Sequence, residues 1–203
     1  MSSQSNSPTA LDTWMRTTRY VFDSAAAANR AVAGATDGRS NGDGSGGEPS
    51  GEIEAGETLP EWHVELSERD SERLGIGDYV EFSKTITDGD VRSFAAASGD
   101  TNPLHLDDEY AEQTAFGQRL THGVLAGSLI SAALARLPGQ VVYLSQDFEF
   151  HAPAHPDDRL TARIEIVESL GDDQYRLRTT VTEEGETIID GEAVVVARAN
   201  PAQ

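Results

Sequence analysis

The sequence predicts an α+β domain in which a curved antiparallel sheet wraps one long, buried helix. The run "THGVLAGSLISAALARLPG" (residues 121–139) is almost entirely apolar and ends in a helix-stopping Pro-Gly pair. A helix that is apolar on all sides is a buried one. Four strand-like runs separated by turn sequences follow it, so its packing partner is predicted to be a sheet of consecutive antiparallel strands.

The strand-like runs are identified by alternating apolar and polar side chains. In one of them Ala162, Ile164 and Ile166 alternate with charged residues, which is the period of a half-buried strand. The breaks "AHPDD", "LGDD" and "EEGE" have the composition of hairpin turns. The four runs cover residues 140–153, 158–171, 174–185 and 186–199.

The segment before the buried helix is predicted to hold one strand and two short helices. Residues 77–87 alternate like a strand. Thr87 or Asp88 then caps the helix "DVRSFAAAS", and Asp107 is a suitable cap for a second helix, "DEYAEQ". Between the two helices lies "SGDTNPLH" (residues 98–105), which brings an acid, an amide, a proline and a histidine close together.

Composition divides the chain into three regions. Residues 1–35 hold an amphipathic helix that begins near Thr9 and stops at Gly34, with charged residues on one narrow face and apolar residues opposite. Residues 36–58 read as a flexible linker of glycine, serine and acidic residues. Residues 59–203 have the composition of a globular domain.

The charge of the chain is strongly negative. Its 203 residues include 35 acidic and 15 basic ones, for a formal net charge of −20, and its only lysine is Lys84. Self-repulsion of this charge destabilises a compact state unless salt screens it. We therefore expect a halophilic protein from salt-saturated cells. The alternative is a surface for basic partners, but the acids are spread along the chain, and nucleic-acid binding is disfavoured because phosphates would be repelled.

Several function classes are removed by what the sequence lacks. It has no cysteine, so disulfides, thiolate nucleophiles and cysteine-ligated metals are excluded. No apolar run approaches the roughly 20 residues of a transmembrane helix. The N-terminus shows no basic segment followed by an apolar one, so we expect a cytoplasmic protein.

Asp100 and His105 form a candidate acid–base pair. A carboxylate and an imidazole can hold one water between them, polarise it and exchange its proton with a substrate. The alternative is a purely structural capping loop, since Asp100 and Asn102 are good turn formers and Pro103 fixes its own φ angle. The spacing of these residues does not choose between catalysis and capping.

Two further features of the sequence bear on a site. His122 would complete a metal site with Asp100 and His105, although the sequence has no compact metal-ligand motif. A Ser-His-Asp catalytic triad is disfavoured because the sequence has no GxSxG turn. The free backbone N–H groups at Gly123, where the buried helix starts, can stabilise a developing oxyanion. The alternative is that Gly123 only permits tight packing. The other three histidines are expected to be structural or on the surface.

Two motifs at a matching separation give a family resemblance. "SGDTNPLHLDDEYA" resembles the signature of MaoC-like (R)-specific enoyl-CoA hydratases, and "FGQRLTHGVLAGSLIS" resembles the segment that follows it. With its acidic composition, the chain is similar to a haloarchaeal member. The resemblance covers residues 74–199. It implies a hot-dog fold, an α+β arrangement of a sheet around a long helix, in a homodimer with its active sites near the subunit interface.

The resemblance also implies a reaction and roles for named residues. The reaction is reversible syn addition of water to a trans-2-enoyl-CoA, giving an (R)-3-hydroxyacyl-CoA, with no metal and no other cofactor. Asp100 and His105 are implied to activate the water, and the Gly123 N–H to stabilise the thioester enolate. Asn102 is implied to brace the loop. Ser131, with Ser128 as a near alternative, is implied to hydrogen-bond the catalytic aspartate.

The N-terminal helix is a departure from this family pattern. Its alanine-rich amphipathic sequence resembles granule-coating proteins of polyhydroxyalkanoate inclusions, so residues 9–33 are a candidate for docking on a storage granule. An extra oligomerisation or self-packing helix is the alternative. The rival functions for the whole chain are another hot-dog acyl-CoA enzyme (a branched dicarboxylyl-CoA hydratase or a thioesterase) and a non-catalytic acyl-CoA or granule-binding module.

Overall fold

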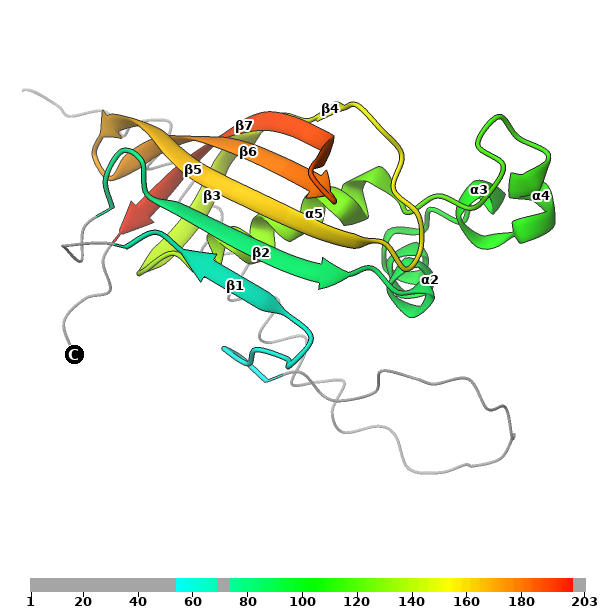
Figure 1. Cartoon of the computed structure of the whole chain (residues 1–203). Helices are drawn as coiled ribbons and strands as arrows, with labels where there is room; N and C mark the ends of the chain where they lie inside the picture. Colours follow the sequence, from blue (N-terminus) through cyan, green and yellow to red (C-terminus); the bar gives the residue numbers. More distant parts are fainter. Residues whose placement is uncertain (1–53, 69–73, 199–203) are drawn as a thin grey trace, which may run out of the picture. The chain divides into compact units, whose positions relative to one another are not determined.

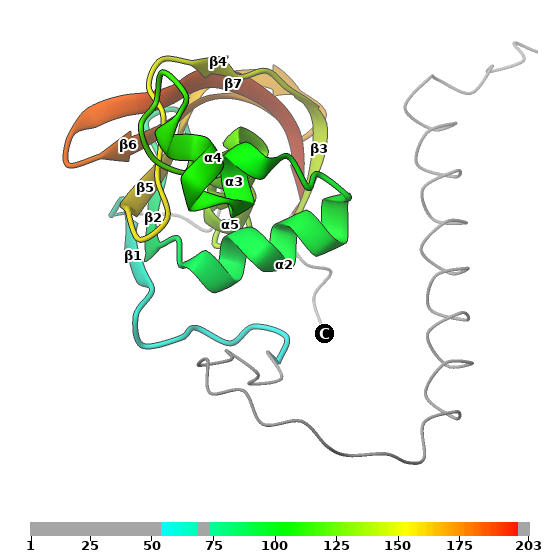
Figure 2. The ribbon, with the colours of Figure 1, turned by 90° about the vertical axis from the view of Figure 1, so that its right-hand side faces the viewer.

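A curved antiparallel sheet with one helix in its concavity is the main feature of the chain. The computed structural model describes residues 54–68 and 74–198. Within them the sheet has seven strands in the order β1-β2-β5-β6-β7-β3, and the short β4 pairs with β7. The sheet curves around helix α5 (Figures 1 and 2), as the sequence predicts. The N-terminal helix predicted within residues 1–35, and the linker as far as residue 53, lie outside the described residues.

The strands and helices follow the predicted order along the chain. The strands are β1 (His63–Leu66), β2 (Tyr79–Thr85), β3 (Gln140–Gln146), β4 (Glu149–Phe150), β5 (Arg159–Gly171), β6 (Gln174–Glu183) and β7 (Glu186–Arg198). The helices are α2 (Asp88–Ser98), α3 (Pro103–Leu106), α4 (Asp108–Glu112) and α5 (Gly123–Leu134). In the part of the chain that the structure describes, every helix is too short or too polar to span a bilayer.

The core lies between α5 and the concave face of the sheet. On α5, Ile130 and Ala133 are fully buried and pack against the sheet. On β5, alternate residues from Leu160 to Ile166 are buried, which confirms the predicted period-2 pattern. The residues between them face outward, where Arg163 pairs with Glu81 at 2.7 Å and with Glu165 at 3.1 Å. This alternation fixes which side of the sheet holds the helix.

Two elements differ from their predicted bounds. The predicted helix over residues 121–139 begins at Gly123 and ends at Leu134, and tighter turns lead from there to Pro138. The proline disfavours helical geometry in the residue before it. The predicted strand over residues 140–153 is split into β3 and β4, and between them the chain passes close to Gly191 on β7. A Cβ atom at Gly191 would collide with the Asp147 carbonyl oxygen.

Helix α5 is not buried on all sides, and here the prediction was wrong. Val124, Ser128, Ser131 and Ala135 are exposed, and their spacing places them on one face of the helix. Val124 is 59% exposed in spite of its apolar side chain. The apolar sequence therefore reflects two surfaces, one packed on the sheet and one open in the single chain.

Helices α2, α3 and α4 gather at the end of the sheet where α5 begins (Figure 2). Each has a side-chain cap at its N-terminus. Thr87 forms a capping box with Asp90, Asn102 accepts from the Leu104 N–H, and Asp107 accepts from the Tyr110 N–H, as predicted for Thr87 and Asp107. Such caps stabilise a helix by about 0.5–2 kcal/mol each. They stabilise the three short helices that surround the "SGDTNPLH" loop.

Candidate active site

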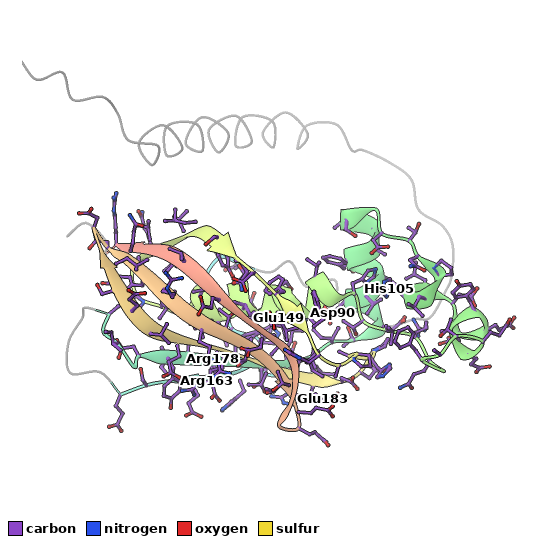
Figure 3. The ribbon with its side chains drawn as sticks, turned by 90° about the horizontal axis from the view of Figure 1, so that it is seen from above. Asp90, His105, Glu149, Arg163, Arg178 and Glu183 are labelled. Atoms are coloured by element: carbon purple, nitrogen blue, oxygen red, sulfur yellow. The ribbon has the colours of Figure 1, made fainter. Side chains whose placement is uncertain are left out.

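Asp100 and His105 face each other across a gap. Asp100 follows Gly99, which ends α2 with a φ of 79°, a left-handed conformation that suits glycine. His105 lies on α3, within the group of short helices (Figure 3). Its Nε2 atom is 3.9 Å from Asp100 Oδ2. This distance is too long for a direct hydrogen bond and is suited to a shared water.

The orientation of the His105 ring is fixed by a backbone carbonyl. His105 Nδ1 lies 2.9 Å from the Leu120 carbonyl oxygen. Because a carbonyl only accepts hydrogen bonds, we infer that Nδ1 carries the proton in the neutral ring. The lone pair of Nε2 is then on the side of Asp100. The ring is mostly buried, whereas the Asp100 side chain is 52% exposed, so the pair joins a fixed imidazole to a solvent-accessible carboxylate.

Asn102 and Pro103 hold the loop between the pair. The Asn102 backbone N–H donates to Asp100 Oδ1 at 3.3 Å, and Asn102 Oδ1 accepts from the Leu104 N–H at 3.0 Å. Pro103 is at the start of α3, where its missing N–H leaves no helical bond unmade. The loop is thus a capped turn, and the same turn aims Asp100 at His105. The capping and acid–base interpretations are compatible in this geometry.

His122 contacts both members of the candidate pair. It is buried, with 2% of its surface exposed, and its ring stacks on that of His105 with 3.9 Å between ring centroids. On its other side Phe94 lies 4.9 Å away, centroid to centroid. His122 Nε2 donates to the Asp100 backbone carbonyl oxygen at 3.0 Å. His122 therefore holds the backbone of one member of the pair and the ring of the other.

The metal alternative brings its three residues together but orients two of them poorly. Ligand atoms of Asp100, His105 and His122 lie within 4.8 Å of one another. The two imidazole planes, however, are stacked and inclined by only 29°. Lone pairs of a histidine lie in the ring plane, so those of two stacked rings run side by side instead of converging on one ion. The geometry favours the acid–base pair.

The N-terminus of α5 presents free backbone N–H groups beside this pair. His122 is its N-cap residue and makes no capping hydrogen bond with its side chain. The first amide bonded within the helix is that of Ala126, which leaves the N–H groups of Gly123, Val124 and Leu125 without helical acceptors. A Cβ atom at Gly123 would stand 2.8 Å from the Phe150 ring. The position of Gly123 is thus consistent with both interpretations, tight packing and an available N–H.

A cavity of about 360 Å³ opens beside His105 and Gly123. Most of its lining is apolar, as a site for a hydrocarbon chain requires. Phe150 and Phe116, each about half exposed, are among the lining residues. The deeper wall comes from α5 and β7, and includes Ala126, Ile188 and Ile189.

The hydrogen bond from Ser131 to Asp100 that the resemblance implied stays a prediction, because Ser131 lies some way along α5 from the candidate pair in the single chain. It lies eight residues along α5 from Gly123, about 12 Å at 1.5 Å per residue. It lines a separate groove of about 290 Å³ between α5 and β3, together with Ser128, Tyr143 and Phe148. Burial raises the pKa of Tyr143 to about 12. None of the residues that line this groove carries a charge at neutral pH.

Sequence reasoning missed two supports of the pair, namely the Leu120 carbonyl and the stacking of His122. A backbone carbonyl has no residue type to signal it, and His122 was considered only as a metal ligand or helix start. Of the other three histidines, His155 and His63 match the expectation of a structural or surface position, whereas the exposed His151 also borders the candidate cavity. His155 donates from Nδ1 to the Arg119 carbonyl oxygen at 2.8 Å, His151 lines the cavity wall, and His63 is exposed on β1.

The two stacked histidines are predicted to be opposite tautomers. When neutral, His105 should carry its proton on Nδ1 and His122 on Nε2, because each of these atoms faces a carbonyl oxygen. Two-bond ¹H–¹⁵N correlation spectra distinguish the nitrogens by their chemical shifts. Finding the proton of His105 on Nε2 would contradict the assigned orientation of the pair.

Comparisons with known proteins place the chain in a family. The family model described as "MaoC like domain" matches residues 74–191. An (R)-specific enoyl-CoA hydratase from Rhodospirillum rubrum is 38% identical over 131 residues, 63% of this chain and 91% of the relative. A 3-hydroxybutyryl-CoA dehydratase from Methylorubrum extorquens is 39% identical over 61% of this chain and 81% of the relative.

A solved structure of similar fold agrees with these sequence matches. It is described as an (R)-hydratase from A. caviae involved in PHA biosynthesis. It superposes with a TM-score of 0.59 at 36% identity, over 64% of this chain and all of the other. The sheet wrapped around α5 is accordingly the hot-dog fold. With its helix-end loop, its fold and its sequence in agreement, this chain belongs to the MaoC-like domain family.

Proposed function

We propose that this chain is an (R)-specific enoyl-CoA hydratase, a hydro-lyase that adds water reversibly and with syn geometry to a trans-2-enoyl-CoA. The observation that carries the proposal is the 3.9 Å gap between His105 Nε2 and Asp100 Oδ2, which suits one water held by both groups. The names of the relatives in Rhodospirillum rubrum and Methylorubrum extorquens describe the same type of chemistry and support it.

In the proposed reaction, the water between Asp100 and His105 gives a proton to this pair while its oxygen bonds to C3 of the enoyl thioester. The electrons of the C2=C3 π bond move toward the thioester carbonyl and form an enolate. The pair then delivers a proton to C2 from the same face, so that one water is added in total. Positioned acid–base groups of this kind accelerate reactions by about 10²–10⁴-fold. The chain's own groups supply this chemistry, and CoA enters only as part of the substrate.

We assign the enolate oxygen to the Gly123 N–H at the start of α5. This end of the helix has no side-chain cap, unlike α2, α3 and α4. The positive end of the helix dipole adds to the attraction for a developing negative charge. One such donor contributes about 10²–10³-fold to a turnover rate. The apolar cavity beside Gly123 suits the acyl portion of the substrate.

We propose that the chain works as a homodimer with α5 at its interface. The exposed stripe of α5 and the edge strand β3 border the same groove, and the groove is largely apolar. A second copy would cover Val124 and the groove wall, which accounts for apolar side chains left open in the single chain. Ser131 would then belong to the interface. A monomer mass from light scattering in high salt would contradict this arrangement.

The rival functions differ in what they do with Asp100, His105 and a thioester. A thioesterase would release free CoA, and a branched dicarboxylyl-CoA hydratase would prefer a substrate with a second carboxylate. A binding module would hold an acyl-CoA without turnover and would not need the pair. The mainly apolar lining of the cavity favours an apolar acyl chain over a dicarboxylic one.

Replacing either member of the pair should abolish hydration. We expect Asp100→Asn and His105→Gln each to lower kcat by at least about 10²-fold, since each removes one holder of the water. The assay follows loss of the conjugated thioester absorbance of crotonyl-CoA in high salt. His63→Gln on β1 and Asp172→Asn in the β5–β6 turn make the same chemical changes far from the site, and should retain wild-type rates.

The other outcomes of this assay contradict the role of the pair or identify a rival function. Hydration that survives both site substitutions removes the pair from the mechanism. Release of free CoA by the wild type indicates a thioesterase. Binding of crotonyl-CoA without turnover indicates a binding module.

We further propose that the product feeds polyhydroxyalkanoate synthesis or fatty-acid metabolism, and that residues 9–33 dock the enzyme on cytoplasmic storage granules. The amphipathic pattern of those residues and the described role of the A. caviae structure support this. In polymer-accumulating cells, a variant lacking residues 1–58 should leave the granule fraction while keeping its hydratase activity. An unchanged distribution of that variant would overturn granule docking.

A further inference from the structure

Arg119 connects the helices that carry the candidate catalytic pair. Its side chain is only 13% exposed and is surrounded by acceptors from three helices. Nη1 donates to Asp88 Oδ1 at 2.5 Å, and Nε donates to Asp108 Oδ1 at 2.6 Å. Nη1 also donates to the backbone carbonyl oxygen of His105 at 3.4 Å. One guanidinium therefore touches the first turns of α2 and α4 and the residue proposed as acid–base group.

Two of those acceptors lie on the helices that lead to Asp100 and carry His105. Asp88 begins α2, and α2 ends at Gly99 next to Asp100. The His105 carbonyl belongs to α3, which places the imidazole. A link from Arg119 to both helices therefore fixes the two members of the pair relative to each other.

The backbone around Arg119 is tied to the same loop. The next residue, Leu120, supplies the carbonyl that orients the His105 ring, and its N–H donates to the Leu104 carbonyl oxygen at 3.1 Å. The Arg119 carbonyl accepts from His155 Nδ1 at 2.8 Å. The Arg119 side chain and the backbone of residues 119–120 thus both form hydrogen bonds that hold the loop in place.

The ion pairs of Arg119 persist across the neutral range. Its hydrogen bond to Asp88 raises the pKa of the guanidinium, and the hydrogen bonds from Arg119 and then Arg92 lower the pKa of the Asp88 carboxyl. Because Arg119 is mostly buried, salt screens its pairs less than it screens surface pairs. A lysine would keep the charge, but its single ammonium cannot reproduce a planar fork that donates from Nε and Nη1 at once.

We propose that Arg119 is a positioning residue for hydration, which holds α2 and α3 so that Asp100 and His105 stay one water apart. This inference rests on the proposed function and adds a residue that touches no reacting atom. Misplacing a reacting group by about 1 Å can cost about 10²-fold in rate. Loss of the fork should therefore act on the chemical step, with little effect on substrate binding.

Arg92 provides a matched control. It also pairs with Asp88, at 2.7 Å, but it is 56% exposed, and among the described residues this link within α2 is its one ion pair. Thr87 provides a second control, because its capping box stabilises α2 and its capping hydrogen bonds are made with Asp90 and not with Arg119. If Arg119 only stabilised α2, substituting it would change kcat no more than these two control substitutions do.

The experiment compares full-length Arg119→Lys, Arg92→Lys and Thr87→Ala in the crotonyl-CoA assay, in high salt and at a temperature where each is folded by circular dichroism. We expect Arg119→Lys to lower kcat by about 10- to 100-fold with KM within about twofold of wild type. Arg92→Lys should be unchanged. Thr87→Ala should lower the Tm but keep its kcat. A folded Arg119→Lys variant with wild-type kcat, or an equal loss in Thr87→Ala, would overturn the proposal.

A second measurement separates this inference from the proposed function. If the wild type fails to hydrate crotonyl-CoA, the proposed function fails. The positioning role is then tested by the ¹⁵N spectrum of the His105 ring. Arg119→Lys should shift or broaden these signals, whereas Arg92→Lys should not. Identical His105 spectra in the wild type and both variants would contradict a positioning role for Arg119.

Discussion

The hydrogen bond between His105 Nδ1 and the Leu120 carbonyl, at 2.9 Å, is the constraint on which the candidate site depends. It sets the tautomer of the ring and leaves the Nε2 lone pair free on the side of Asp100. The carbonyl itself is held because the N–H groups on either side of it are bonded. The Leu120 N–H donates to Leu104, and the Thr121 N–H donates to Ala154 at 2.7 Å. A strand-end loop, a short helix and the approach to α5 therefore share one network.

The fold supplies a rigid frame for this network at the end of the sheet. Helix α5 is anchored in the concavity by fully buried aliphatic residues such as Ile130, so its N-terminus projects at a fixed place beside α3. Capping and the proposed proton transfer do not compete in the loop. The hydrogen bonds of Asn102 that close the turn also hold the Asp100 side chain. The same bonds therefore stabilise the turn and orient the carboxylate.

Much of this arrangement could be predicted from the sequence, because local patterns encode it. Period-2 alternation located the strands from β5 to β7, and Thr87 and Asp107 marked helix starts. What failed depended on contacts distant in sequence. The open face of α5 was read as buried because apolar composition does not say which surface covers it. The role that the resemblance implied for Ser131 stays a prediction, since one chain places it about 12 Å farther along the helix than Gly123 and a second chain is needed to test it. Arg119 carries no motif, and its role is visible only once three helices converge on it.

The central claim is that one water, held by Asp100 and His105 on one face of the substrate, supplies both new substituents. Hydration of crotonyl-CoA in D₂O tests it most directly, with the product analysed by proton NMR coupling constants and chiral chromatography. The account predicts a single (R)-3-hydroxybutyryl-CoA with one deuterium at C2 on the same face as the new hydroxyl. An (S)-product, or deuterium distributed over both faces of C2 at early times, would contradict it.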